Sequence, residues 1–274
     1  MTAPFAGSGT DGLTVASWNV NSLRLRLPQV ARLMEERPID VLCVQEIKAA
    51  PDKVPLMEMA ALGFPYHAVH SMPGYNGVGI FSRHPVEGQE TLDWCGKGDC
   101  RHIRARVAGI DIHCLYVPAG GDLPDPEENP KFRHKLDFID ALTEWSAQAI
   151  DPDVPTVMTG DFNVAPLETD VWDHKKMRRI ITHTPIEREK LEAFQNSGSW
   201  VDAMRRFVSP EEKLFTWWSY RARDWKAANR GRRLDHFWVT PVLACRLSGM
   251  EVFDAARAWE KPSDHAPVIV RLSP

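Results

Sequence analysis

The stretch that decides the fold runs from residue 13 to residue 46 and reads LTVASWNVNSLRLRLPQVARLMEERPIDVLCVQE. LTVASW (13–18) is an apolar run of strand length. DVLCVQE (40–46) is almost continuously apolar, which is typical of a strand buried on both faces. Between them, LPQVARLMEE (27–36) repeats apolar residues at helical spacing, with Pro38 as the stop. Strand, helix and strand in this order predict a layered α/β fold.

The alternation of strands and helices continues to the end of the chain. An amphipathic helix is predicted for NPKFRHKLDFIDALTEW (129–145). The hairpin-like neighbours 77–83 and 102–117 indicate mixed rather than purely parallel sheets. Residues 1–12 are rich in Gly, Ser, Thr and Pro and predict a flexible tail, which leaves residues 13–274 as a single domain. The other predicted strands are GVGIFSR (77–83), HIRARVAGIDIHCLYV (102–117), VPTVMTG (154–160), RLDHFWVT (233–240) and APVIVRL (266–272).

Composition excludes several classes of protein. The 274 residues are 43% hydrophobic and 26% charged, as in an ordinary globular protein. Five scattered cysteines argue against a disulfide framework, and the spacing of Cys95, Cys100 and His102 fits no standard zinc finger. With no signal peptide and no apolar run of the ~18 residues that span a bilayer, we expect a cytoplasmic protein that does not bind membranes. The net charge of −4 does not suggest nonspecific binding to nucleic acid, although the local field matters more than the sum.

Polar side chains collect where the predicted strands end or begin. A strand that ends and an antiparallel strand that begins share one rim of a sheet, where sites are commonly built. Carboxylate and amide oxygens are the ligands that Mg²⁺ prefers, and a single histidine argues against zinc. The residues are Asn19 and Asn21, Gln45 and Glu46, Tyr116, Asp161 and Asn163, Asp235, and Asp264 with His265.

Each of these residues has an ordinary structural explanation when taken alone. Asp161 in GDFN fits a turn, Glu46 a solvated strand end, and Asn19 a local hydrogen-bonding cap. A lone histidine such as His265 is more often a satisfied core residue than a ligand. The joint occurrence of all of them at strand ends favours a site.

The strand-end residues lie within longer motifs that follow one another along nearly the whole chain: SWNVNSLR (17–24), VQEIK (44–48), GYNGVGIFS (74–82), LYVP (115–118), TGDFNVAPLETDV (159–171), FTWWSYR (215–221), NRGRRLDHFWVT (229–240) and KPSDHAPV (261–268). In these motifs the sequence resembles the exonuclease III family of AP endonucleases, within the wider endonuclease/exonuclease/phosphatase superfamily, and most closely its bacterial members. Single motifs such as GDFN are moderately specific, whereas their combination with FTWWSYR and NRG-x-R-L-D is highly specific.

The resemblance implies a four-layer α/β sandwich of two mixed sheets flanked by helices, forming a single catalytic domain. It implies a hydrolase with Mg²⁺, or Mn²⁺, as cofactor, which incises duplex DNA 5′ to abasic sites and cleans blocked 3′ ends. A 3′→5′ exonuclease activity accompanies these, and we expect the protein to work as a monomer. The implied metal residues are Asn19, Glu46, Asp161, Asn163, Asp264 and His265, and the implied catalytic residues are Tyr116, Asp161, Asn163, Asp235 and His265.

The implied roles divide the reaction among these side chains. Asp161 matches the residue that orients or deprotonates the attacking water, and Asn163 helps to hold that water. His265, charged and oriented by Asp235, and Tyr116 match the groups that contact the scissile phosphate.

Two basic runs provide candidate contacts to the DNA backbone. Residues 221–233 carry six Arg or Lys against one Asp, and residues 174–179 read HKKMRR. A short charge run is as often a solvated face. The resemblance places Trp217 and Leu234 in a pocket for an extrahelical sugar, although Phe215, Trp217 and Trp218 also fit core positions. The predicted DNA-binding residues are Trp217, Arg221, Asn229, Arg230, Arg233 and Leu234.

The sequence departs from the family pattern at three places. Ala119 stands where relatives often carry Asn or Gln, Arg232 where they often carry Trp or Leu, and the loop 120–130 is acidic. These changes affect substrate preference more than chemistry. The alternatives are a 3′→5′ exodeoxyribonuclease with weak AP activity, a superfamily phosphatase on lipid, inositol or RNA substrates, and a DNA-binding module without catalysis.

Overall fold

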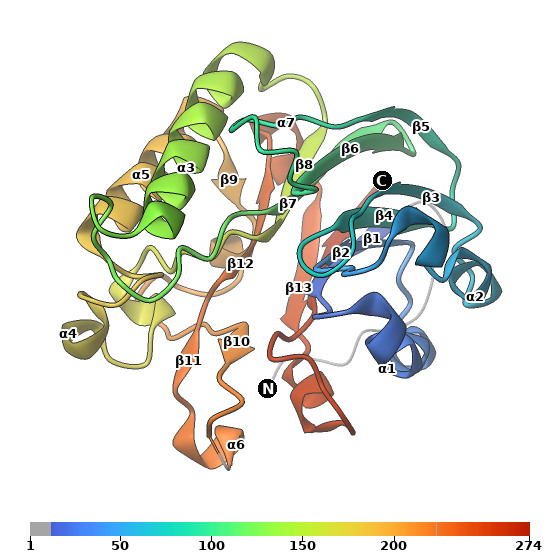
Figure 1. Ribbon diagram of the computed structural model, residues 1–274. Coiled ribbons are helices and arrows are strands. Elements are labelled where there is room, and N and C mark those ends of the chain that lie inside the picture. Colours follow the sequence, from blue (N-terminus) through green and yellow to red (C-terminus); the bar gives the residue numbers. More distant parts are fainter. Residues whose placement is uncertain (1–11, 223) are drawn as a thin grey trace.

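The computed structural model describes residues 12–222 and 224–274. It shows two six-stranded sheets packed face to face, with helices covering both outer faces (Figure 1). The predicted four-layer sandwich of mixed sheets is therefore confirmed. Of the predicted tail, residues 1–12, only Gly12 lies among the described residues. No helix in the described part of the chain combines the length and the apolar composition needed to cross a membrane.

The first sheet contains β1 (Leu13–Asn19), β2 (Val41–Gln45), β3 (Tyr66–His70), β4 (Val78–Ser82), β13 (Leu247–Val252) and β14 (Val268–Leu272). The second contains β5 (Val86–Glu90), β6 (His102–Val107), β7 (Ile110–Tyr116), β8 (Thr156–Asp161), β9 (Val201–Asp202) and β12 (Asp235–Val239). A ribbon of β10 (Trp217–Trp218) and β11 (Gly231–Arg232), with α6 (Trp225–Ala228) between them, extends from the lower edge in Figure 1. The other helices are α1 (Leu23–Glu36), α2 (Leu56–Ala61), α3 (Pro130–Ala149), α4 (His174–Met177), α5 (Pro185–Ser197) and α7 (Pro241–Ala244), and the short 3-10 turns are η1 (Pro51–Lys53), η2 (Glu168–Asp170), η3 (Met204–Arg206) and η4 (Asp254–Ala258).

The strand order is β13-β14-β1-β2-β4-β3 in the first sheet and β5-β6-β7-β8-β12-β9 in the second. At the centre of each sheet one parallel pair, β1 with β2 and β7 with β8, lies among antiparallel neighbours. Each parallel pair ends at the same edge of its sheet. The polar residues that follow these strands are therefore delivered to a common edge of the sandwich.

Alternation along the strands builds three apolar layers. Val15 and Cys43 point between the sheets, where they meet Ile112 and Val157 of the second sheet. Their neighbours in sequence point outward, where the first sheet is covered by α1 and α2 and the second by α3 and α5. Burying one large aliphatic side chain contributes about 1.5–3 kcal/mol. Residues on one side of each strand therefore hold the two sheets together, and residues on the other side hold the helices against the sheets.

Three sequence-based expectations were wrong in detail. The run 102–117 is not one strand but the hairpin β6–β7, because Ala108 and Gly109 adopt positive φ values of 49° and 78° and turn the chain. Strand β4, within 77–83, lies in the first sheet and packs on this hairpin rather than pairing with it. The first helix begins at Leu23 instead of Leu27 and contains Pro28.

A buried histidine pair joins the β6–β7 hairpin. The backbone N–H of Leu92 donates to Nδ1 of His102, so Nε2 of His102 carries the proton that it donates to Nδ1 of His113, 3.0 Å away. Burial lowers the pKa of His113 to about 3 and that of His102 well below its usual value. Burial also lowers the pKa of His236, on β12, to about 4. The folded protein therefore keeps these imidazoles neutral at neutral pH.

We expect the protein to lose stability as the pH falls below 6.5, where the unfolded chain protonates these histidines and the folded chain does not. The loss is about 1.4 kcal/mol per pH unit for each such histidine. Urea unfolding at pH 7.5 and pH 5.0 measures it. His236→Gln preserves an amide donor to the Val164 carbonyl, which His236 contacts at 2.8 Å, and should lose less stability between the two pH values. An equal loss in the variant contradicts the assignment.

Candidate active site

Strand register brings three of the predicted residues together in the second sheet. Tyr116 at the end of β7 is paired with Asp161 at the end of β8, and Asp161 is paired with Asp235 at the start of β12. In the first sheet, β1 ends at Asn19 opposite Gln45, directly before Glu46. The site therefore forms where the two sheets meet at one edge.

Backbone conformation at this edge is unusual. Gly160 has a φ of 145°, and a Cβ there would lie 2.0 Å from the carbonyl oxygen of Leu115. Glu46 and Asn163 adopt positive φ values of 58° and 53°, which cost L-residues about 1 kcal/mol or more each. Only glycine fits before Asp161. The surrounding hydrogen bonds must hold Glu46 and Asn163 in place.

A hydrogen-bond network links the two sheets through Asn19. Its Nδ2 donates to Oε1 of Glu46 and to Oδ2 of Asp161, both at 2.9 Å. The Tyr116 hydroxyl donates to the same Glu46 oxygen at 2.9 Å. The oxygen of the Asn19 amide instead accepts from the backbone N–H of Asn21 at 3.0 Å. In this arrangement Asn19 therefore positions the carboxylates and turns its oxygen away from them.

Asp161 and Asn163 form a second tight group. The backbone N–H of Asn163 donates to Oδ1 of Asp161 at 2.9 Å, and its side-chain amide donates to the carbonyl of Val117 at 2.9 Å. The Nζ atom of Lys135 on α3, fully buried, reaches the carbonyl of Asn163 at 2.7 Å and pairs with Glu187 on α5. The helical layer behind the sheet thus fixes the loop that carries Asn163.

His265 is oriented by Asp235. Its Nδ1 donates to Oδ2 of Asp235 at 2.8 Å, and its Nε2 lies 3.6 Å from Oδ2 of Asp161. Burial alone would lower the pKa of His265, but Asp235 and Asp161 outweigh it and raise that pKa well above its usual value. His265 is therefore an imidazolium at neutral pH, with Nε2–H directed into the site.

The carboxylates differ in their proton affinity. Burial raises the pKa of Asp161, with only partial compensation by His265. Burial would also raise that of Glu46, but Lys48 and the bond from Asn19 hold its pKa below the ordinary value. Glu46 is thus a permanent anion, whereas Asp161 is the carboxylate that readily accepts a proton.

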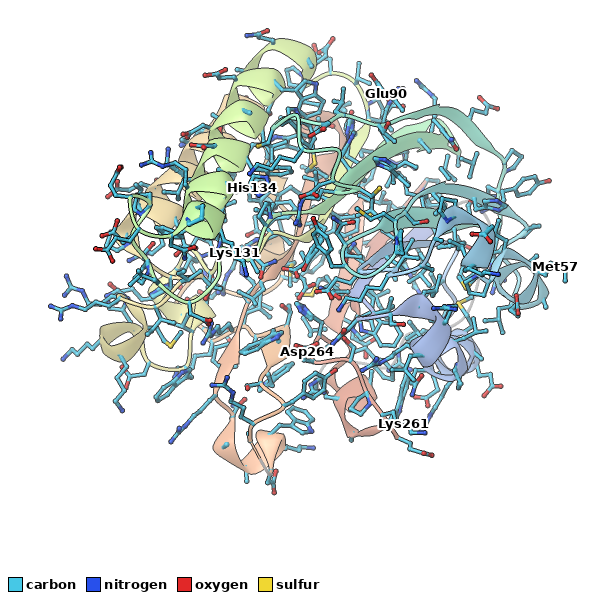
Figure 2. The ribbon with its side chains drawn as sticks, in the orientation of Figure 1. Met57, Glu90, Lys131, His134, Lys261 and Asp264 are labelled. Carbon is cyan, nitrogen blue, oxygen red and sulfur yellow. The ribbon has the colours of Figure 1, made fainter. Side chains whose placement is uncertain are left out.

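Asp264 lies on the outer side of this cluster. In Figure 2 it lies a little below the centre of the molecule, beside the upper end of the β10–β11 ribbon, whereas Met57 and Glu90 lie at the periphery. The indole Nε1 of Trp217 donates to Oδ2 of Asp264 at 2.9 Å, and the backbone of Trp217 pairs with that of His265 in an isolated antiparallel β-bridge. Asp264 therefore connects the charged cluster to the aromatic ribbon.

The site has the charge and the donor atoms of a hard-cation site. The site holds four carboxylates, those of Glu46, Asp161, Asp235 and Asp264, and within the described residues they form ion pairs with two basic groups, His265 and Lys48. The Nζ atom of Lys48 lies 2.5 Å from Oε2 of Glu46 and 2.7 Å from Oδ1 of Asn21, so that a cation already bridges an amide and a carboxylate oxygen. A divalent ion would balance the remaining two negative charges, and the donor set fits such an ion.

A more compact set of possible ligands lies deeper. Among residues 12–222 and 224–274, Asp161, Asp235 and His265 present ligand atoms within 4.8 Å of one another. His265 Nδ1 and one Asp235 oxygen are already hydrogen-bonded to each other. Glu46 and its oxygen-bearing neighbours are therefore the better-suited part of the site for a metal.

The ribbon and α4 border a cavity of about 840 Å³ beside this cluster. Arg221 and Arg230 line it and are exposed, and the Arg230 guanidinium lies 5.0 Å from the centre of the Trp172 ring. Trp217 lines the same cavity, with buried Leu234 packed nearby in one apolar cluster. Asn229, also exposed, accepts a bond from the Trp218 indole at 3.1 Å.

Three other aromatic and basic residues of these motifs, Phe215, Trp218 and Arg233, are buried. Trp218 and Phe215 are buried together, in agreement with the core explanation for two of the three aromatics. Arg233, predicted to bind DNA, is only 1% exposed and is paired with Asp170 and Asp202 at 2.6–3.0 Å. Its guanidinium lies beneath the surface and does not line the cavity. A guanidinium buried in this way is poorly placed to contact DNA.

Comparison with known proteins agrees with this geometry. The family model described as "Endonuclease/Exonuclease/phosphatase family" matches residues 16–265, which include every residue of the cluster. The chain belongs to the endonuclease/exonuclease/phosphatase family. Its members are phosphodiester hydrolases, and the chain is therefore an enzyme of this class.

Similar proteins include an exodeoxyribonuclease, an AP endonuclease and a 3′ phosphatase. An exodeoxyribonuclease of Bacillus subtilis is 30% identical over 93% of this chain and 98% of its own length. The solved structure of an AP endonuclease from Archaeoglobus fulgidus superposes with a TM-score of 0.88 at 32% identity, covering 94% of this chain and 98% of its own. A 3′ phosphatase from Neisseria, bound to product DNA hairpin, gives the same TM-score at 33% identity, covering 95% and 99% of the two chains.

Within this family site, Lys48 and Lys135 were not singled out from the sequence, and Asn21 was named only as one of the polar residues at strand ends. Lys48 follows Glu46 by two residues in VQEIK, and Asn21 follows Asn19 in the same spacing, so their proximity was available as a signal. Lys135 gave none. It is a charged residue within an amphipathic helix, and only the packing of α3 against α5 shows that it is buried.

Proposed function

We propose that this enzyme incises duplex DNA 5′ to abasic sites and removes blocking groups from 3′ ends, with an accompanying 3′→5′ exonuclease activity. The observation that carries the proposal is the cluster of Glu46, Asp161 and the Asp235–His265 pair beside a cavity lined by aromatic and basic residues. The similar proteins named as AP endonuclease, exodeoxyribonuclease and 3′ phosphatase support it.

We further propose that residues 13–274 form one catalytic domain that acts as a monomer in the cytoplasm. The five cysteines are all free, which suits a reducing compartment. The cofactor that we propose is Mg²⁺, with Mn²⁺ as a substitute. Glu46 would hold it with help from Asp264 and from the amide oxygens of Asn21 or Asn163, and Asn19 would join them once its amide rotates to turn the oxygen toward Glu46. When bound, it would neutralise charge on the phosphate and on the departing oxygen.

The chain's own residues account for the remaining steps. Asp161 takes a proton from a water that Asn163 helps to orient, and this water attacks the phosphorus. The bond between phosphorus and the 3′ oxygen breaks, and that oxygen leaves and takes up a proton. His265, as an imidazolium, and the Tyr116 hydroxyl donate hydrogen bonds to the phosphoryl oxygens, whose negative charge grows in the transition state.

The cavity provides a physical basis for selecting damaged DNA. A nucleotide is turned out of the duplex most easily where base pairing is already lost. Trp217 and Leu234 provide an apolar surface for the exposed sugar, and Arg221, Arg230 and Asn229 lie around it to contact the backbone. Lys176, from the second basic run, lines the same cavity.

A duplex with one tetrahydrofuran abasic analogue tests the proposal directly. Nicking 5′ to the analogue that requires Mg²⁺ and stops with chelator is the expected result. Binding without nicking would indicate a module that has lost catalysis, and hydrolysis of only a lipid or inositol phosphate would indicate a different substrate class. Degradation of 3′ ends with weak nicking would favour the exonuclease alternative.

Arg230 is expected to contact a backbone phosphate, because it is exposed at the cavity and forms no ion pair with a described carboxylate. Arg230→Gln should weaken DNA binding and reduce the slope of log affinity against log salt by about one unit. Titrations with a fluorescent abasic duplex in chelator, from about 50 to 200 mM salt, measure this slope. Lys53→Gln, at an exposed position near α2, is the matched control. An unchanged slope in Arg230→Gln excludes the contact.

A further inference from the structure

A buried ion pair lies behind the loop that carries Asn163. Lys135 on α3 and Glu187 in the first turn of α5 are both fully buried and are bonded to each other. The two helices lie side by side on the outer face of the second sheet (Figure 1). Replacing a buried ion pair by apolar side chains of similar size is often neutral for stability. The role of this pair is therefore to be sought in the groups that it contacts.

The ammonium group of Lys135 has one acceptor for each of its three N–H donors. It reaches the carbonyl oxygen of Asn163 at 2.7 Å, the carbonyl oxygen of Ala119 at 3.4 Å and a carboxylate oxygen of Glu187. A Cβ placed at Gly120 would lie 3.0 Å from Cδ of the lysine, so the stem of the side chain is closely packed. The ammonium is therefore held at one place, from which it joins two loops at the active-site edge.

The carbonyl of Asn163 depends on this contact. No other donor to it is found among residues 12–222 and 224–274. Asn163 also has a positive φ of 53°, which an L-residue keeps only where its surroundings hold it. Its backbone N–H is bonded to Asp161 and its side-chain amide to the Val117 carbonyl, so Lys135 supplies the remaining anchor. Without Lys135 a buried carbonyl would be unsatisfied, and the loop would relax.

Glu187 keeps its other partners when Lys135 is removed. Its carboxylate accepts the backbone N–H groups of Thr182 and Thr184 at 2.9–3.0 Å and the Thr184 hydroxyl at 2.7 Å. It also lies in the first turn of α5, where the helix dipole favours an anion. A substitution of Lys135 therefore leaves α5 capped, and its effect falls on the carbonyls of Asn163 and Ala119.

We propose that Lys135 is a positioning residue for the hydrolysis: it holds Asn163, and through Asn163 the attacking water, in the geometry that Asp161 needs. The inference rests on the proposed function, in which Asn163 helps to orient that water. Lys135 does not touch the substrate, because it is fully buried behind the loop. Its effect therefore belongs to the rate of the chemical step and not to DNA binding.

Lys135→Met tests the proposal, since methionine fills the space of the lysine stem and supplies no donor. We expect kcat on the tetrahydrofuran duplex to fall about tenfold or more, because misplacing a catalytic group by about 1 Å can cost on the order of a hundredfold. The Kd for the same duplex in chelator should stay within about twofold of wild type, as for a group that acts only in the transition state. Thermal melting checks that the variant is folded.

Lys190→Met is the matched control. Lys190 on α5 also joins the two helices, but its partner is Asp140 on α3, at 2.6 Å, rather than a carbonyl of the catalytic loop. Its removal should leave kcat unchanged. A loss of kcat in Lys190→Met as large as that in Lys135→Met would show that helix pairing sets the rate, and would overturn the proposal.

A double-mutant cycle with Asn163 distinguishes positioning from packing. If Lys135 acts through Asn163, Lys135→Met should lower kcat little further in an Asn163→Ala background. Glu187→Gln keeps Lys135 and withdraws its anion, so it should give a smaller loss of kcat that also disappears in that background. An unchanged kcat in folded Lys135→Met, or additive losses in the cycle, overturns the proposal. Where Lys135→Met does not fold, an unchanged kcat in Glu187→Gln overturns it.

Failure of this inference is distinguishable from failure of the proposed function. Equal kcat on the tetrahydrofuran duplex for the wild type and Lys135→Met retains the function and removes the inference. A wild-type enzyme that acts neither on this duplex nor on blocked 3′ ends loses the proposed function, and the inference with it.

Discussion

Asp161→Asn is expected to lower turnover on an abasic duplex at least about a thousandfold while DNA affinity in chelator stays within about threefold of wild type. The substitution preserves the size of the side chain and removes its ability to take up a proton. Asp161 is the buried carboxylate whose pKa burial raises, which makes it the strongest proton acceptor of the cluster. The loss should therefore appear in kcat rather than in binding.

Asp161 also accepts hydrogen bonds that the variant must preserve. Oδ1 of Asp161 accepts the backbone N–H of Asn163, and Oδ2 accepts the side-chain amides of Asn19 and Asn163. An amide at position 161 retains one acceptor, so melting temperature and DNA affinity must be measured beside the rate. Asp153→Asn, at an exposed turn before β8, controls for the loss of one negative charge. Turnover close to wild type in a folded Asp161→Asn protein would remove Asp161 from its proposed role.

The parts of this fold that the sequence predicted well are those with few physical alternatives. An apolar run such as 40–46 must be buried on both faces, and a polar residue directly after it must lie at a sheet edge. Strand ends far apart in the sequence therefore predict a common edge. Tyr116, Asp161 and Asp235 are indeed neighbours across three adjacent strands.

Charge runs carried much less information, because a basic residue has the same sequence signature on a surface and in a buried ion pair. Arg230 and Arg233 belong to one run, yet Arg230 is exposed at the cavity and Arg233 is buried between Asp170 and Asp202. The partners of Arg233 are distant in the sequence: Asp170 lies on η2 and Asp202 on β9. Only tertiary packing distinguishes the two residues. The hairpin at Ala108 was missed for a related reason, since alanine gives little warning of a positive φ.

The family resemblance and the residue chemistry contributed different things. The resemblance directed attention to Trp217 and Leu234, whereas the folded chain showed that Arg232, noted only as a departure, lies half-buried over the Trp217 ring and donates to the Thr182 hydroxyl. A departure from a family pattern can therefore be interpreted only when its neighbours are known. Lys135 illustrates the same point, since it acts through a contact with the Asn163 carbonyl that spacing alone does not predict.

His265→Gln is expected to lower kcat at least about a hundredfold, and Asp235→Asn to produce a loss of similar size, because the two side chains act as one unit. The 2.8 Å bond from His265 to Asp235 orients Nε2 toward the phosphate site, and Asp235 and Asp161 keep the imidazole charged despite its burial. Removing either partner removes the same oriented cation. The double variant should therefore be little worse than the worse of the two single variants.

The pH dependence of Asp235→Asn distinguishes this role from simple packing. A histidine with a raised pKa is charged below that pKa and loses its proton as the pH rises through it. In the wild type His265 loses its proton only well above neutral pH, so the rate should show no titration of His265 between pH 6 and pH 8. Without the Asp235 carboxylate the pKa falls, so the residual rate of Asp235→Asn should decline as the pH rises from 6 to 8. Chemical denaturation must show that the variant is folded across that range. Fully additive losses in the double variant, or parallel pH profiles for wild type and Asp235→Asn, would mean that Asp235 does not act through His265.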